Sequence, residues 1–433
     1  MNILIFTFGS RGDVQPYVAL GAALRKNGHN VTVSTGQGFD AMIEAHGLTA
    51  APSSMNYREI IDTPEAQAAF RSMSGKFRAM HTFKDLVRRQ FEEMWDLARE
   101  VQPDLMLYHP KGFLAQDIAE ALDAIAVPTT LQPSYVPTGA FPNPFLPFSD
   151  LGAFGNRLTH HFIDRLTFWA QTSLVGSWRQ DRLGLRSDTS IRDFFAGYHP
   201  HGRTVPRLHG YSAALVPRPH DWSEREHITG YWLLEPDLEW QPPEDLSRFL
   251  AEGPPPVYVG FGSMPAADVE AQTDIVIEAL QRANQRGVLA TGWGGLQVTK
   301  TASNRIHFVD AVPHDWLFPR CSAVVHHGGA GTTHEGLRWG RPTVICPLGV
   351  DQPYWGRRVN ALGAGPPPLP QKRLNSHDLA EAIVAALRPS CAHRAAQLGD
   401  AIRAEGGAAM AAAVLEELDR VDRWPADNVA ASN

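Results

Sequence analysis

The stretch from His326 to Gln352 contains residue types that could bind a phosphorylated ligand. Its first part, HHGGAGTTHEG, places Gly328, Gly329 and Gly331 and two threonines just after an apolar run that ends at Val325. Glycines let a backbone turn tightly and approach a bulky group, and the N-terminus of a following helix presents unsatisfied N–H groups and a partial positive charge. A diphosphate fits such a cradle. A glycine cluster taken by itself more often makes only a strand-to-helix turn.

The pair Asp351-Gln352 favours binding over a simple turn. It follows the next predicted strand, and its carboxylate and amide could bind sugar hydroxyls. The ring of His327 could add a hydrogen-bond donor to the phosphate cradle.

Asp13 is a second chemical candidate, at the end of the run Gly9-Ser10-Arg11-Gly12-Asp13. It could accept a proton from a reacting hydroxyl. It could equally cap the helix that begins here, whose first turn contains Pro16. An aspartate of ordinary pKa is a weak base, which would accept the proton late in the reaction.

These residues must be positioned by alternating strands and helices. Apolar runs typical of buried parallel strands occur in both halves of the chain, at 3–8, 31–34, 105–108, 127–131, 257–261, 288–290 and 306–309. Helical patterns lie between and after them, at 115–122, 156–183, 275–285, 377–387, 391–404 and 408–418. This order predicts an α/β fold with parallel sheets.

A chain of 433 residues is too long for a typical single domain. We predict an N-terminal Rossmann-like domain over 1–215, a proline- and charge-rich linker over 216–244 and a C-terminal Rossmann-like domain over 245–405. Residues 406–433 would form a helix and tail that could pack back on the first domain. Both halves open with a strand followed by Gly-Ser, so the two domains are expected to face each other across a cleft.

The segment from Pro133 to Pro147 is rich in proline and aromatic residues, which excludes regular helix or central strand. At the carboxyl edge of a parallel sheet, such a loop could line a binding site for an apolar ligand. Covering the core of its own domain is the alternative. The acceptor-site candidates in this loop are Tyr135, Phe141 and Phe145. His109, at a sheet edge, could also line the acceptor site or have only a structural role.

Composition and charge narrow the class further. The net charge of −7 argues against a broad nucleic-acid surface, and no apolar stretch is long enough to span a membrane. The first apolar run lacks the basic region of a signal peptide. The three cysteines are unpatterned, and no HExxH or CxxC motif occurs, so we expect a cytoplasmic protein without a metal site.

The motifs together resemble the sterol glucosyltransferases and their bacterial relatives. The matching segments run over nearly the whole chain, from GSRGDVQPYVALGAALRKNGHNVTV through FPNPF, TGYW, FGSM, TGWGG and VPHDWLFPRC to HHGGAGTTHEG and PLGVDQPYWGRRV. The resemblance implies a GT-B glycosyltransferase that is inverting and metal-independent and that uses a nucleotide sugar, UDP-glucose or a dTDP-sugar, as co-substrate without any further cofactor. The donor would bind the C-terminal domain and the acceptor the N-terminal domain.

The resemblance also assigns roles to particular residues. Asp13 would be the general base, and spacing to Glu335 places the phosphate-binding histidine at His327 instead of His326. The residues implied for donor binding are Ser10, Arg11, Gly12, Ser263, Trp293, Val312, His327, Gly329, Ala330, Gly331, Thr332, Asp351 and Gln352.

The expected acceptor is a bulky hydrophobic alcohol such as a sterol, macrolide, polyketide or terpenoid, which leaves peripheral membrane contact open. Two other functions fit the same architecture. A sugar-nucleotide epimerase would need acid–base groups beside the sugar and no acceptor site. A non-catalytic nucleotide-sugar-binding protein would need no base.

Overall fold

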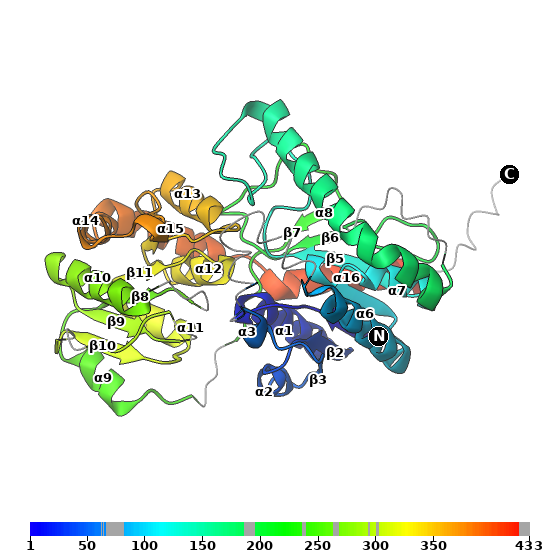
Figure 1. Cartoon of the computed structure of the whole chain (residues 1–433), viewed down its shortest axis with the longest axis horizontal. Helices are drawn as coiled ribbons and strands as arrows, with labels where there is room; N and C mark the ends of the chain where they lie inside the picture. The colour runs from blue at the N-terminus through cyan, green and yellow to red at the C-terminus, as the bar shows by residue number, and fades with distance from the viewer. Residues whose placement is uncertain are drawn as a thin grey trace.

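The computed structural model describes residues 1–61, 63, 65, 82–185, 195–235, 240–262, 268–292, 295–299 and 303–423. Two parallel sheets organise them, with helices packed around each sheet (Figure 1). The first has seven strands in the order β3-β2-β1-β4-β5-β6-β7, and the second has five in the order β10-β9-β8-β11-β12. The predicted α/β class with two Rossmann-like halves is confirmed.

The N-terminal sheet and its helices take up the first half of the chain. The strands are β1 Asn2–Phe6, β2 Asn30–Thr35, β3 Thr49–Pro52, β4 Leu105–Tyr108, β5 Ile125–Thr130, β6 Arg207–His209 and β7 Glu226–Ile228. The helices are α1 Arg11–Lys26, α2 Asp40–Glu44, α3 Tyr57–Ile61, α6 Lys84–Val101, α7 Ala115–Leu122 and α8 Gly152–Leu183, with the short 3-10 helix η1 at Pro110–Gly112.

The C-terminal half repeats the pattern around a smaller sheet. Its strands are β8 Val257–Gly260, β9 Gly287–Ala290, β10 Ile306–Val309, β11 Ala323–His326 and β12 Thr343–Ile345. Its helices are α9 Glu244–Ala251, α10 Val269–Arg282, α11 His314–Leu317, α12 Ala330–Arg338, α13 Gln352–Ala361, α14 Ser376–Ala386, α15 Pro389–Arg403 and α16 Gly407–Arg423, with 3-10 turns at Phe318–Arg320 and Gln371–Arg373.

The strand β1 shows why its sequence is an unbroken apolar run. Ile3 and Ile5 face the core shared with α1, whereas Leu4 and Phe6 face the core shared with α6 and α7. Because helices cover both faces, successive side chains are buried on opposite sides and no polar alternation appears. The strand therefore ends where polar residues begin, and that end carries the candidate base.

The N-terminal sheet extends into the range predicted as the linker. β7 pairs in parallel with β6, and Trp232 is fully buried in the core of the same domain. The predicted boundary at residue 215 therefore lies too early. The range 216–244 is rich in prolines and charged residues, and its strand β7 has only three residues. A strand this short shows no alternation of apolar and polar residues, so the sequence did not predict it.

The helix α16 returns to the N-terminal domain and packs on α1. Ala411, Ala412 and Leu415 are fully buried in the core cluster that also contains Val18 and Leu24 of α1. Figure 1 shows α16, in red, beside the blue and cyan elements of this domain. The side-chain amide of Asn27 donates a hydrogen bond of 2.7 Å to Glu416 Oε1 at the rim of this contact.

Apolar and polar contacts join the two halves. One buried cluster contains Tyr211 and Trp222 of the N-terminal half together with Tyr354 and Trp355 of α13. The backbone N–H of Ser212 donates to His334 Nε2 on α12 at 3.1 Å, and its hydroxyl donates to Glu405 Oε1 at 2.9 Å. The element that begins at the glycine-rich turn is thus attached directly to the other domain.

Candidate active site

Asp13 lies in the first turn of α1 and closes a capping box. Gly9, at a φ of 144°, turns the chain after β1, and Ser10 is the N-cap. Asp13 Oδ2 accepts hydrogen bonds from the Ser10 backbone N–H at 2.8 Å and from the Ser10 hydroxyl at 3.1 Å. The capping interpretation is therefore confirmed for one oxygen of the carboxylate.

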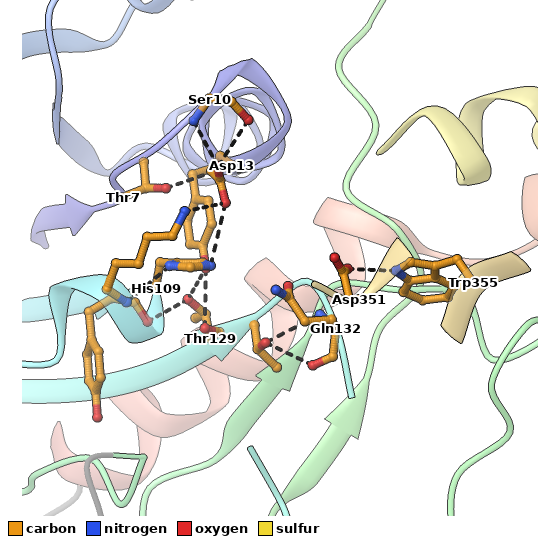
Figure 2. Close-up of polar contacts among 12 residues, drawn as sticks. Thr7, Ser10, Asp13, His109, Thr129, Gln132, Asp351 and Trp355 are labelled. Carbon is orange, nitrogen blue, oxygen red and sulfur yellow. Dashed lines mark hydrogen bonds and ion pairs between the residues drawn. The ribbon is translucent and has the colours of Figure 1, made fainter. Parts of the chain in front are cut away.

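The other oxygen, Oδ1, faces two basic side chains from the loop after β4. Lys111 Nζ donates to it at 2.9 Å, and His109 Nε2 lies 3.9 Å away (Figure 2). The backbone N–H of Lys111 donates to His109 Nδ1 at 3.1 Å, which places the ring proton of a neutral imidazole on Nε2, toward Asp13. Burial lowers the pKa of His109 to about 3, so the ring is neutral at physiological pH.

The charge state of Asp13 follows from these contacts. Burial raises its pKa, but the Lys111 ammonium and the hydrogen bonds from Lys111 and Ser10 outweigh burial, and the pKa lies below its ordinary value. The side chain is 22% exposed. The structure thus presents an ionised carboxylate that reaches solvent at the carboxyl edge of the N-terminal sheet.

The two adjacent histidines of the glycine-rich turn have different roles. His326 is fully buried, and its Nδ1 accepts a hydrogen bond of 2.9 Å from the Gly328 N–H, which braces the turn. The ring of His327 lies between two glycines, because an added Cβ would approach it to 2.9 Å at Gly262 and 2.6 Å at Gly329.

The imidazole of His327 could bind a ligand at this turn. Within the described part of the chain, its buried Nδ1 has no hydrogen-bond partner. Burial lowers the pKa of His327 to about 4, so the ring is neutral and can donate from one nitrogen. A buried nitrogen in this state is suited to an incoming acceptor atom such as a phosphate oxygen.

The helix α12 begins immediately after this ring. Its N-cap is Gly329, and among the described residues no cap side chain accepts a hydrogen bond from the first turn. Thr333 donates its hydroxyl to the carbonyl of Gly329 at 2.8 Å, while Ala330, Gly331 and Thr332 are half-buried. The N-terminus of α12 is adjacent to the ring of His327, because a Cβ at Gly329 would lie 2.6 Å from His327 Nε2, and the two together could hold a diphosphate.

Asp351 is the N-cap residue of α13, and its carboxylate is held on one side. Trp355 Nε1 donates to Asp351 Oδ2 at 2.8 Å (Figure 2). Burial raises the pKa of Asp351 to about 6. The residue before it, Val350, has a φ of 58°, an unusual conformation for a β-branched residue and one that recurs at binding sites.

Gln352 braces the same loop. Its side-chain carbonyl accepts hydrogen bonds from the backbone N–H groups of Leu348 at 2.8 Å and Gly349 at 3.3 Å. The side-chain carbonyl thus fixes the loop around Asp351. Any contact with a sugar would use the amide end of Gln352.

Asp13 and Asp351 come from different domains and face the same interdomain region. Burial raises the pKa of Tyr135, and the charges of both Asp351 and Asp13 raise it further. Burial also raises the pKa of Tyr231, and the charges of Glu335, Asp13 and Asp351 raise it further. The ring of Tyr231 stacks on His334 of α12 at 4.4 Å between ring centroids.

The segment 133–147 forms a loop without regular structure, as predicted. Tyr135 contacts Phe145 at 6.0 Å between ring centroids, and Phe141 contacts Tyr354 of α13 at 5.7 Å. The loop therefore reaches across to the C-terminal domain instead of only covering its own sheet. His109, by contrast, is 1% exposed, and its Nε2 lies 3.9 Å from Asp13 Oδ1.

The remaining predicted donor-site residues lie as follows. Arg11 begins α1 and is exposed; burial lowers the pKa of His314 on α11, and the charge of Arg11 lowers it further. Gly12 is exposed in the first turn of α1, and Val312 is half-buried in the loop before α11. Ser263 and Trp293 lie outside the described residues.

A surface cavity of about 350 Å³ lies elsewhere, lined by Gln102, Asp104, Asp123, His199 and His201 among others. It opens at the amino ends of β4 and β5, whereas Asp13 and Lys111 follow the carboxyl ends of β1 and β4. Ligands of open α/β sheets bind at the carboxyl ends. The cavity is therefore separate from the candidate site.

Sequence reasoning missed two residues of the site, Lys111 and Tyr231. Lys111 had a usable signal, since it follows β4 by only three residues and carboxyl ends of neighbouring parallel strands meet at one edge. Tyr231 lies in the segment TGYW, which carries part of the family resemblance, but this segment falls in the range interpreted as linker, so no site role was predicted for it.

Two family models match the chain. The Glycosyltransferase family 28 N-terminal domain matches residues 3–107, and the Erythromycin biosynthesis protein CIII-like, C-terminal domain matches residues 276–418. Together they cover both sides of the site.

Similar proteins of known function include two sterol 3-beta-glucosyltransferases of Arabidopsis thaliana. The first is 34% identical over 94% of this chain and 64% of its own length, and the second is 31% identical over 95% and 67%. A sterol 3-beta-glucosyltransferase of Emericella nidulans is 34% identical, but the match spans 29% of that protein. The chain thus spans about two thirds of the plant relatives and less than a third of the fungal one.

Solved structures resemble the fold over nearly the full chain. The glycotransferase of kitacinnamycin is 20% identical with a TM-score of 0.70, covering 96% of this chain and 98% of that one. The calicheamicin glycosyltransferase is 18% identical with a TM-score of 0.70, covering 97% and 98%. In the described part of the present chain, no helix is long and apolar enough to cross a membrane.

The fold in two halves, with the candidate site at their junction, agrees with the sequence identity to these relatives over almost all of the chain. The chain belongs to the GT-B glycosyltransferase family that contains the sterol 3-beta-glucosyltransferases.

Proposed function

We propose that the protein is an inverting glycosyltransferase that moves glucose from UDP-glucose to a hydroxyl of a bulky hydrophobic acceptor. The observation that carries this proposal is the pair of carboxylates from two domains. Asp13 of α1 and Asp351 of α13 face the same interdomain region, and the neutral His327 and the α12 N-terminus belong to the second domain.

The donor would bind the C-terminal half through groups already oriented for it. The first-turn N–H groups of α12 and the unpaired nitrogen of His327 would receive the diphosphate. Asp351, held by Trp355, would accept hydrogen bonds from sugar hydroxyls and fix the anomeric carbon for attack. Arg11, facing α11, would approach the diphosphate from the acceptor domain.

The reaction then needs one base and one leaving group. The acceptor hydroxyl gives its proton to Asp13 while its oxygen forms a bond to the anomeric carbon. The bond between that carbon and the diphosphate oxygen breaks, and the nucleoside diphosphate leaves from the opposite face with the electron pair. A single displacement of this kind inverts the anomeric configuration.

We further propose that the transfer requires no metal ion. The negative charge that develops on the diphosphate would be stabilised by the α12 N-terminus and by donation from His327. Transfer that is unchanged in the presence of EDTA is the expected result. Loss of transfer in EDTA that Mg²⁺ restores would overturn this part of the proposal.

The acceptor class is the least specified part. We propose a sterol or another hydrophobic alcohol such as a macrolide, polyketide or terpenoid, held by the aromatic loop that contains Tyr135, Phe141 and Phe145. The relatives' names include sterol glucosyltransferases, and the aromatic rings of this loop reach the donor domain. A dTDP-sugar is the alternative donor.

The decisive experiment incubates the protein with UDP-glucose or dTDP-glucose and a panel of sterols and macrolides. Mass spectrometry should detect a hexose adduct, and NMR should show a β-linkage from the α-linked donor. Asp13→Asn should abolish the adduct while calorimetry shows unchanged UDP-glucose binding. Conversion of UDP-glucose to an epimer would support the epimerase instead, and binding without any product would support a binding protein.

Two aspects of location extend the proposal. We propose a cytoplasmic enzyme, supported by three cysteines that are free thiols. We also propose peripheral contact with lipid bilayers through α8, where Phe154, Leu158 and Phe162 are 85%, 58% and 58% exposed at helical spacing. Co-sedimentation with lipid vesicles should be lost in Phe154→Asp/Phe162→Asp, and binding that persists in this variant would exclude α8.

A further inference from the structure

We propose that Lys111 is a positioning residue of the transfer reaction, whose ammonium occupies the place of the acceptor hydroxyl at Asp13 Oδ1 until the acceptor displaces it. This inference rests on the proposed function and names a residue that the motifs did not contain. It is based on the different hydrogen-bond partners of the two carboxylate oxygens of Asp13.

The two oxygens of Asp13 are not equivalent. Oδ2 accepts two hydrogen bonds from Ser10, both of which belong to the cap of α1 and persist as long as the helix begins at this residue. Oδ1 is therefore the oxygen that could accept a proton from a substrate. In the structure, that oxygen is bonded to Lys111 Nζ at 2.9 Å.

The backbone of Lys111 is held by contacts, whereas its side chain is exposed to solvent. Its N–H donates to His109 Nδ1, and the next residue, Gly112, packs against Phe6 so closely that a Cβ there would lie 3.1 Å from the Phe6 Cβ. The side chain, however, is 47% exposed. Rotation about its own bonds can therefore move the ammonium away from Asp13 without moving the backbone.

Gly9 provides the room for this contact. A Cβ at Gly9 would lie 2.6 Å from Lys111 Nζ, at a φ of 144° that other residues rarely adopt. The turn after β1 thus admits the ammonium directly over the backbone beside Asp13. The same open side would admit a hydroxyl group of the acceptor once the ammonium has moved.

His109 can take over part of the lysine's contact. Its Nε2 is buried, carries the proton and has no hydrogen-bond partner in the described part of the chain. At 3.9 Å it is too far from Asp13 Oδ1 for a hydrogen bond. When Lys111 leaves, a small approach of this N–H would keep the carboxylate oriented while Oδ1 receives the acceptor hydroxyl.

Several other groups also influence Asp13, and Lys111 is the cation in direct contact with it. The groups that face Asp13 from the surrounding elements are His109 and Lys111 after β4, Tyr17 on α1, Tyr57 on α3, Tyr135 and Tyr231 from loops, and Asp351 from the other domain. The tyrosines and the histidine are neutral near pH 7. Removing Lys111 should therefore raise the pH at which Asp13 takes up its proton.

The test compares Lys111→Met, Lys111→Arg and the matched control Lys26→Met, which removes an exposed lysine at the far end of α1. The acid limb of kcat/KM against pH should move up by about 1–2 pH units in Lys111→Met, stay in place in Lys26→Met, and return in Lys111→Arg. The acceptor KM of Lys111→Met should be no higher than that of the unaltered enzyme, since a competitor for Oδ1 is gone.

A second readout does not depend on any transfer activity. In protein labelled with ¹³C at the aspartate carboxyl carbons, the Asp13 resonance is assigned by its loss in Asp13→Asn, and its titration midpoint should rise in Lys111→Met. An unchanged midpoint overturns the role of Lys111. An unchanged acid limb together with a higher acceptor KM also overturns it, because Lys111 would then be an acceptor ligand. A raised midpoint in a protein without transfer activity supports the Lys111–Asp13 coupling and overturns only the proposed function.

Discussion

Asp351→Asn is expected to stabilise the protein at alkaline pH while it weakens donor binding. Burial raises the pKa of Asp351 from 3.8 to about 6 in the folded state. A shift of roughly two units corresponds to about 3 kcal/mol at about 1.4 kcal/mol per unit. Because the side chain is partly open to solvent, we expect about 1–2 kcal/mol.

The sign follows from proton binding. The folded protein holds the Asp351 proton more tightly than the unfolded chain, so this contribution to stability is present below about pH 4 and is lost as pH rises through about 6. Asparagine has no charge to bury. The advantage of Asp351→Asn should therefore be small at pH 4.5 and grow by about 1–2 kcal/mol at pH 8.

Urea unfolding followed by circular dichroism at pH 4.5 and pH 8 measures this difference as a shift of the midpoint. Calorimetry at pH 7.5 measures the functional effect. The amide oxygen of Asn can still accept from Trp355 Nε1, but a charged acceptor for sugar hydroxyls is lost, so UDP-glucose should bind about tenfold more weakly.

Asp221→Asn provides a control of opposite sign. Burial raises the pKa of Asp221, but hydrogen bonds from the Gly139 N–H, Thr138 and Arg157 outweigh it and bring the pKa to about 2. Asp221→Asn should lower stability at both pH values by about 1–2 kcal/mol. A gain for Asp351→Asn that is equal at pH 4.5 and pH 8, or a loss at pH 8, would refute the role of burial.

Three further predictions concern the cap of α1, the glycine-rich turn before α12 and the contact between the domains. Asp13→Ala should lower the free energy of unfolding by about 0.5–2 kcal/mol and the transfer rate by at least about 100-fold. Asn375→Ala, which removes the N-cap of α14, should lower stability alone, and an equal loss of transfer in both variants would leave Asp13 a structural role only. Gly328→Ala should lower the urea midpoint by the equivalent of about 1–3 kcal/mol, because its φ is 95° and a Cβ would lie 2.6 Å from a methyl group of β12; an unchanged midpoint would contradict this. His334→Ala leaves the Ser212 N–H without its acceptor, so hydrogen exchange of that peptide should accelerate about tenfold by mass spectrometry, and an unchanged rate would show that the contact is not needed.

Much of the fold could be predicted because its strands are buried on both faces. The run from Ile3 to Phe6 is apolar at every position for this reason, and the same holds for β4 and β8. The sequences of strands at the edge of a sheet indicate their structure less clearly. β7 has only three residues, Glu226–Ile228, and its buried Glu226 is hydrogen-bonded to His209 Nε2 at 2.9 Å, so its sequence does not look like that of a strand.

Some residues of the candidate site could likewise be predicted from the sequence, and others could not. Asp13, His327 and Asp351 stand next to glycines or strand ends, where local sequence shows that something must approach the backbone. Lys111 and Tyr231 reach the site through tertiary contacts, Lys111 from the residues just after β4 and Tyr231 from a range that was interpreted as linker. The sequence also left two roles open for Asp13, and the structure shows why: one oxygen caps a helix while the other faces a cation.

The packing of α16 on α1 has a consequence for synthesis on the ribosome. His29 and Glu416, which are 3.3 Å apart in the finished protein, are separated by 387 residues. The groove on α1 that receives Ala411, Ala412 and Leu415 must therefore stay uncovered while the whole donor domain is translated. During that time the nascent N-terminal domain exposes apolar surface that chaperones can bind, and the emergence of α16 from the exit tunnel allows this domain to complete its core.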